Sequence, residues 1–150
     1  MILLWLACST PAPVASPPEA SVDAPLPGDS LYLLDTPLET ADGTTVPLGV
    51  HRGHPTLVSM FYASCPQACP MLIQDIRTLE DLLDDTERAD TRVLLVSLDP
   101  ERDTPERLAE VLRTHDVDPA RWTLGRTSPE NVREIAAVLG IRYRALAAGE

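Results

Sequence analysis

Two cysteines, Cys65 and Cys69, are the residues of this chain best suited to chemistry. They follow the apolar run Thr56 to Tyr62, whose composition and length predict a buried strand. After them, apolar residues recur at helical spacing, at Leu72, Ile76, Leu79 and Leu83. The pair is therefore predicted at a strand-to-helix junction, where free backbone N–H groups and the positive end of the helix dipole favour a thiolate over a thiol. Thiolates in such positions are nucleophiles and metal ligands.

The spacing of the two thiols leaves three uses open. Positions i and i+4 of a helix have Cβ atoms about 5 to 6 Å apart, whereas a disulfide needs about 3.5 to 4.5 Å, so Cys65 must bend inward to close one. Reduced, the pair is wide enough to hold one soft metal ion, because metal–thiolate distances are about 2.3 Å with zinc as the guide. A disulfide here would stabilise by only about 2 kcal/mol, because the loop it closes is short. A structural disulfide is therefore less favoured than a redox or a metal-binding role.

Composition limits the classes of function. The 150 residues carry a formal net charge of −11, and all 12 basic residues are arginine. The sequence has no basic cluster, so nucleic acid is not an expected partner, and the acidic surface indicates solubility. The three cysteines separate into the pair and one N-terminal thiol, Cys8, so the chain is not a disulfide scaffold. Its length allows one domain and a tail.

The N-terminal residues predict an anchor and a tether. Residues 1–8 end in Leu6-Ala7-Cys8, which with Ser9 resembles the end of a bacterial lipoprotein signal peptide whose cysteine is lipidated. The alternative is a disordered N-terminus with a chance cysteine. Residues 9–29 form a proline-rich, semi-rigid linker. Together these segments predict a membrane-anchored protein of the cell envelope, outside the cytoplasm, on the periplasmic face.

The remaining chain predicts an α/β domain. A small hairpin is expected around the turn dipeptide Asp42-Gly43, followed by alternating strands and helices that imply parallel pairing. In chain order the expected elements are hairpin strands Leu31–Leu34 and Thr44–Leu48, strand Thr56–Tyr62, a helix to about Asp85, strand Arg92–Leu98, a helix from Asp103–Glu106, strand Trp122–Leu124, a helix from Ser128 to Gly140, and strand Ile141–Ala145.

Two loops of this domain should meet at one edge of the sheet. Cys65 follows one predicted parallel strand, and the acidic stretch Asp99–Asp103 follows the next. In such sheets ligands collect beyond the carboxyl ends of the strands. The alternative for the acidic stretch is a solvated turn that ends in a helix cap.

Three stretches together resemble the Sco (SenC) family of copper chaperones: Met60–Pro70, Val96–Glu106 and Leu139–Tyr143. The resemblance covers about residues 30–150 and implies a thioredoxin-like fold for this domain. It also implies that further strands and a helix follow Glu150, so residues 30–150 would be an incomplete domain. The strand Thr56–Tyr62 would then have an unpaired edge in this chain, which predicts self-association.

The resemblance further implies a function. Members of the family bind one copper ion, Cu(I) or Cu(II), through both cysteines and a histidine, and they serve assembly of the binuclear copper centre in cytochrome c oxidase subunit II. By this resemblance Cys65 and Cys69 are copper ligands, and the partner is subunit II or another copper or thiol protein. The third ligand, a histidine, is expected beyond Glu150. Gln67 stands where many relatives have Asp.

The histidines of this chain are not expected to replace the missing ligand. His54 precedes the strand that leads to Cys65, about 23 Å away at 3.3 Å per residue, and His51 lies further back. His115, at the end of the second helix, projects toward the other edge. Packing or surface roles are predicted for these histidines.

A second function uses the same cysteines. Cys65 and Cys69 could form the redox pair of a thiol-disulfide oxidoreductase that keeps partner cysteines reduced through a mixed disulfide. A peroxidase of the same fold is a third reading. Thioredoxin-type reductases usually have two residues between their cysteines, whereas three stand here, and this favours metal binding.

Overall fold

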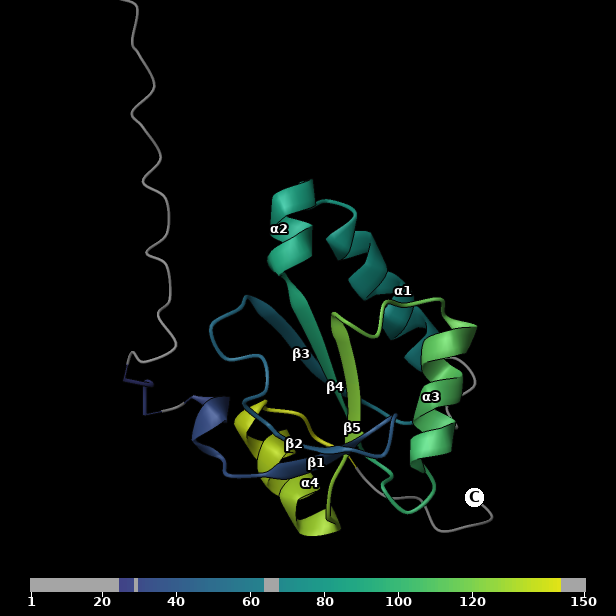
Figure 1. The fold of residues 1–150 in the computed structure, drawn as a ribbon. Coiled ribbons are helices and arrows are strands. Elements are labelled where there is room, and N and C mark those ends of the chain that lie inside the picture. The colour runs from purple at the N-terminus through teal and green to yellow at the C-terminus, as the bar shows by residue number, and fades with distance from the viewer. Residues whose placement is uncertain (1–24, 29, 64–67, 144–150) are drawn as a thin grey trace, which may run out of the picture.

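The computed structural model of the chain describes residues 25–28, 30–63 and 68–143. Within them, strands form one five-stranded sheet in the order β2-β1-β5-β4-β3, with helices on both of its faces (Figure 1). The elements are a 3₁₀ helix Leu31–Leu33, β1 Pro37–Thr40, β2 Thr45–Pro47, β3 Thr56–Phe61, α1 Ala68–Glu80, α2 Asp85–Asp90, β4 Arg92–Ser97, α3 Pro105–Thr114, β5 Trp122–Arg126 and α4 Pro129–Val138.

The strands β5, β4 and β3 lie next to one another in the sheet and are parallel, as the sequence predicts. Phe61 of β3 is in register with Ser97 of β4, and Val96 is in register with Gly125 of β5. The carboxyl ends of these strands therefore lie at the same end of the sheet, which is the lower end in Figure 1. Among the described strands β3 is at the edge, with β4 as its neighbour.

Both faces of the sheet are buried, and β4 shows why its sequence is continuously apolar. Val93 and Leu95 belong to the core under α1 and α3, whereas Leu94 and Val96 belong to the core under α4, and all are fully buried. Neighbouring residues of a strand point to opposite faces, so a central strand covered on both sides needs apolar residues throughout. Trp122 and Phe61 are the largest side chains of the first core.

The N-terminal hairpin exists, but its first strand is later than predicted. Residues Leu31–Leu33 form a 3₁₀ helix, because the Ser30 side chain caps it by accepting the N–H of Tyr32. The first strand is instead Pro37–Thr40, which pairs with β2 on one side and antiparallel with β5 on the other. The hairpin is therefore part of the main sheet.

The turn of this hairpin is held by Asp42. Its carboxylate accepts hydrogen bonds from the Thr40 hydroxyl at 2.5 Å and from the backbone N–H and hydroxyl of Thr44 at 3.0 and 2.7 Å. These bonds lower the pKa of Asp42 to about 2. Gly43 has φ +79°, a conformation that glycine adopts without strain.

The helix after the cysteines ends earlier than Asp85, the predicted end. α1 stops at Glu80, and a separate helix, α2, starts with the Asp84–Glu87 capping box. The Asp84 carboxylate accepts the N–H groups of Thr86 and Glu87, which favours a new helix start over continuation. Of the predicted apolar face, Ile76 is buried and Leu72 packs against the core, whereas Leu79 is 50% exposed. Ile73, which that prediction does not include, is buried as well.

The strand predicted at Ile141–Ala145 is wrong for its described residues, because residues 141–143 have no regular secondary structure. Gly140, at φ +68°, ends α4, and the Ile141 N–H turns back to the Ala136 carbonyl at 2.8 Å. This C-terminal cap packs Ile141 against the core beneath α4. Residues 144 and 145 lie outside the described residues.

Candidate functional site

The thiol pair belongs to the connection between β3 and α1. Cys65 lies in the segment 64–67, outside the described residues, and the backbone of Cys69 lies in the first turn of α1. β3 ends at Phe61 and α1 begins at Ala68, so Cys65 lies between the predicted strand and helix in the sequence, and Cys69 is the second residue of that helix. The described chain leaves the sheet after Phe61, at the carboxyl end of β3.

The acidic stretch meets the start of this connection. The backbone N–H of Ala63 donates to Oδ2 of Asp103 at 3.0 Å, although the two residues are 40 positions apart. This contact confirms that the loops after β3 and β4 lie at the same edge. Asp103 is 1% exposed, so the alternative of a wholly solvated turn is wrong for this residue.

The rest of the acidic stretch does behave as a turn and a helix cap. Asp99 pairs with Arg102 at 3.2 Å across the turn, and Glu101 is exposed. Thr104 is the N-cap of α3 and accepts the Arg107 N–H at 3.4 Å. A side-chain hydrogen bond with Thr104 also lowers the pKa of Glu106. The sequence thus indicated the cap, but the contact of Asp103 with Ala63 depends on the tertiary structure.

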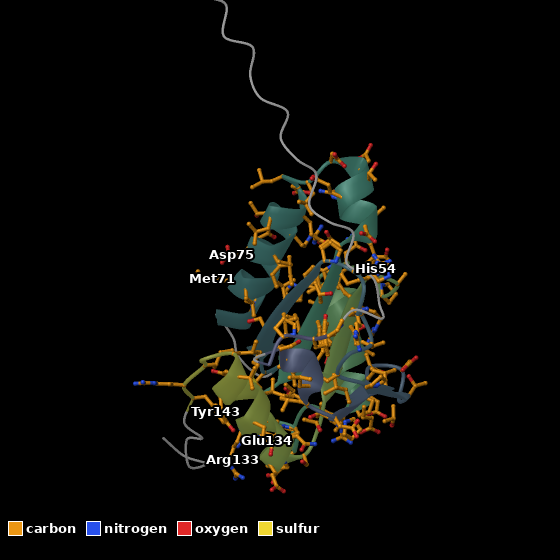
Figure 2. All side chains as sticks on the ribbon, turned by 90° about the vertical axis from the view of Figure 1, so that its left-hand side faces the viewer. His54, Met71, Asp75, Arg133, Glu134 and Tyr143 are labelled. Atoms are coloured by element: carbon orange, nitrogen blue, oxygen red, sulfur yellow. The ribbon has the colours of Figure 1, made fainter. Side chains whose placement is uncertain are left out.

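The histidines have other partners. His51 is buried and its Nε2 lies 2.9 Å from the Thr123 hydroxyl, while Nδ1 of His54 lies 2.6 Å from Asp90. His54 and Asp90 precede β3 and β4, so they lie at the amino ends of these strands, opposite the carboxyl end at which β3 leads toward Cys65. Figure 2 shows His54 at that amino end. The predicted surface and packing roles of His51 and His54 are confirmed.

His115 is the C-cap of α3, and its carbonyl accepts a hydrogen bond from Arg77 at 2.7 Å. Among the described residues, no three His, Cys, Asp or Glu side chains are grouped to hold a metal ion. Cys65 lies outside the described residues, and two soft thiolates are ligands suited to Cu(I).

The architecture defines a class of protein. The parallel strands with helices on both faces, and a cysteine pair of which one member precedes α1 and the other lies in its first turn, match solved structures of the thioredoxin-like α/β fold. The SCO1/SenC family model matches residues 37–149, so this chain belongs to the SCO1/SenC family. The fold and the family inferred from the sequence are confirmed.

Individual relatives extend this result. A SCO2-like protein of Rickettsia typhi is 32% identical over 62 residues, which is 41% of this chain and 30% of that protein. The chain thus spans about a third of the length of the curated relatives it matches. ScoI of Bradyrhizobium japonicum, solved with copper bound, matches with a TM-score of 0.65 and 22% identity over 77% of this chain and 71% of its own.

A third relative, BsSco, is described as a member of the Sco family of cytochrome c oxidase assembly proteins that has a disulfide switch. It is 25% identical, with a TM-score of 0.58 over 67% of this chain and 58% of its own.

Proposed function

We propose that this protein is a copper-binding metallochaperone for assembly of the binuclear copper centre in cytochrome c oxidase subunit II. The carrying observation is that this SCO1/SenC chain has two cysteines, Cys65 and Cys69, in the sequence that follows the carboxyl end of the parallel strand β3. The copper-bound ScoI relative supports copper as the cargo, and BsSco, a member of the Sco family of cytochrome c oxidase assembly proteins, supports oxidase assembly as the context.

The chemistry of the pair fits transfer of a metal ion. Two thiolates bind Cu(I) strongly because both ligand and metal are soft. With few protein ligands, the bound ion is open to attack by the thiolates of a partner, so copper can move by stepwise ligand exchange without a free ion. The third ligand proposed for the full-length protein is a histidine beyond Glu150.

A competition titration tests the proposal. The reduced protein should take about one Cu(I) per chain from a coloured Cu(I) chelator under anaerobic conditions. The variant Cys65→Ser, Cys69→Ser should lose this uptake, and Cys8→Ser is the matched control that should retain it. Undiminished affinity in the double variant would refute the role of the pair.

The second candidate function is thiol-disulfide exchange with a partner, and the disulfide switch of BsSco supports it. The pair of this chain would attack a partner disulfide, release one partner thiol, and then close its own disulfide to release the other. A protein that reduces a copper-free partner disulfide, but does not compete for Cu(I), would favour this function over the first.

We also propose that Cys8 is lipidated and that residues 9–29 hold the domain away from the membrane, on the periplasmic face. The support is the Leu6-Ala7-Cys8-Ser9 sequence and the proline-rich composition after it; these residues lie outside the described ones, except 25–28. No helix of the described residues is long and apolar enough to cross a bilayer. Labelling with a fatty-acid analogue in cells, lost in Cys8→Ser, is the expected result; equal labelling of both would refute lipidation.

A further inference from the structure

Ala63, the last described residue before the thiol segment, is held from both sides by the acidic stretch and the helix that follows it. Its N–H donates to Oδ2 of Asp103 at 3.0 Å, and its carbonyl accepts from the guanidinium of Arg107 at 3.4 Å. In Figure 1 the start of α3 lies at the same end of the sheet as the end of β3. Two side chains that are far from Ala63 in sequence thus hold both backbone polar groups of this residue.

The contact of Asp103 continues the pairing of β3 beyond the end of the strand. The last backbone rung between the strands is the Leu98 N–H donating to the Phe61 carbonyl at 2.7 Å. Alternate residues of a parallel strand face the same neighbour, so the next amide of β3 to face β4 is that of Ala63. The carboxylate of Asp103 takes this amide in place of a backbone carbonyl.

Asp103 itself is rigidly placed. The Ser97 hydroxyl, fully buried, donates to the same Oδ2 at 2.5 Å, and the backbone N–H of Asp103 donates to the Asp99 carbonyl at 3.0 Å. Ser97 Oγ also accepts the Asp99 N–H at 3.0 Å. The side chain is therefore locked between the end of β4 and the N-cap of α3, Thr104.

Stability alone does not account for Asp103. Its second oxygen, Oδ1, is buried and has no hydrogen-bond partner within the described residues. Burying an unsatisfied carboxylate oxygen costs free energy, so a protein selected only for a stable core has no reason to place one here. Buried polar groups of this kind call for a specific explanation.

We propose that Asp103 is a positioning residue for the thiol pair. Asp103 fixes the backbone of Ala63, two positions before Cys65. The point at which the chain departs toward Cys65 is thereby fixed relative to α1, the helix that contains Cys69. Without this contact Cys65 samples more positions, and closing either a disulfide or a metal chelate costs more ordering entropy. The inference deepens the proposed function, since it assigns a residue that supports the same thiols.

The test is the disulfide equilibrium of the pair with glutathione, in which two thiols and oxidised glutathione give the intramolecular disulfide and two reduced glutathione molecules. The ratio is measured by thiol trapping and mass spectrometry in a Cys8→Ser background. Asp103→Ala should lower the formation constant about tenfold, which corresponds to a reduction potential about 30 mV higher. Asp103→Asn keeps an acceptor oxygen for the Ala63 amide and should stay within about threefold of the parent protein.

The matched control is Ser128→Ala, which removes the N-cap of a different helix, α4, and should leave the constant within twofold. An unchanged constant in Asp103→Ala, or an equal change in Ser128→Ala, would overturn the proposal. If Asp103→Ala does not fold, Ser97→Ala replaces it: a fall of about threefold supports the proposal, and no change overturns it. The measurement needs no copper. A failure of the parent protein to bind Cu(I) would therefore refute the proposed copper function, but it would not decide whether Asp103 positions the thiol pair.

Discussion

The buried carboxylate of Glu80 should be a main determinant of stability. Glu80 is 5% exposed at the end of α1, and its Oε1 pairs with the Arg121 guanidinium while its Oε2 accepts the indole N–H of Trp122 at 3.3 Å. Truncation in Glu80→Ala removes a hydrogen bond to a charged group, about 1.5–3 kcal/mol, and leaves a buried indole N–H without an acceptor, about 1–3 kcal/mol.

The loss of the hydrogen bond to Arg121 should cost an amount near the lower end of its range. The side chain of Arg121 is 20% exposed, and it keeps contacts to Asp118 at 3.5 Å and to the Arg88 carbonyl at 3.2 Å. The expected loss in the free energy of unfolding is therefore about 2.5–4.5 kcal/mol.

Urea unfolding of the reduced protein measures this loss, with an unchanged m-value as evidence that both variants unfold to the same extent. Asp81→Ala is the matched control. Asp81 directly follows Glu80 and pairs with Arg88 of α2, but its side chain is 71% exposed. The variant should therefore lose less than about 1 kcal/mol of unfolding free energy. A loss below 1 kcal/mol for Glu80→Ala, or equal losses for the two variants, would refute the argument.

Two further predictions concern packing and pH. Gly125→Ala should destabilise by about 1–3 kcal/mol, because a Cβ there would lie 3.1 Å from Cβ of Leu38 on β1; urea unfolding equal to that of the parent protein would show that β1 shifts freely. Burial, with smaller contributions from Arg92 and His54, lowers the pKa of His51 below 6.5. The unfolded chain then binds the proton first, so stability should fall as pH drops below about 6.5 and be constant just above it. This slope should disappear in His51→Asn when unfolding is followed between pH 5.5 and 7.5, and a slope that persists would assign the effect to other groups.

The sequence by itself determined the features that depend on local patterns. The continuous apolar run of β4 indicated a strand buried on both faces, and Thr104-Pro105 and Ser128-Pro129 marked the starts of α3 and α4, because cap and first-turn preferences act within a few residues. The three motif stretches identified the family, which the family model confirms, and the cysteine spacing predicted the chemistry, since both depend on residue types in order.

Only the tertiary structure decided where local signals compete or distant residues meet. Residues 31–33 have the composition of a strand, but Ser30 caps them as a 3₁₀ helix, and Ile141 is drawn back onto α4 by the cap at Gly140. Asp103 looked like part of a helix cap. That it is buried and binds the amide of Ala63 follows from the parallel pairing of β3 with β4, which brings residues 40 positions apart to the same edge of the sheet.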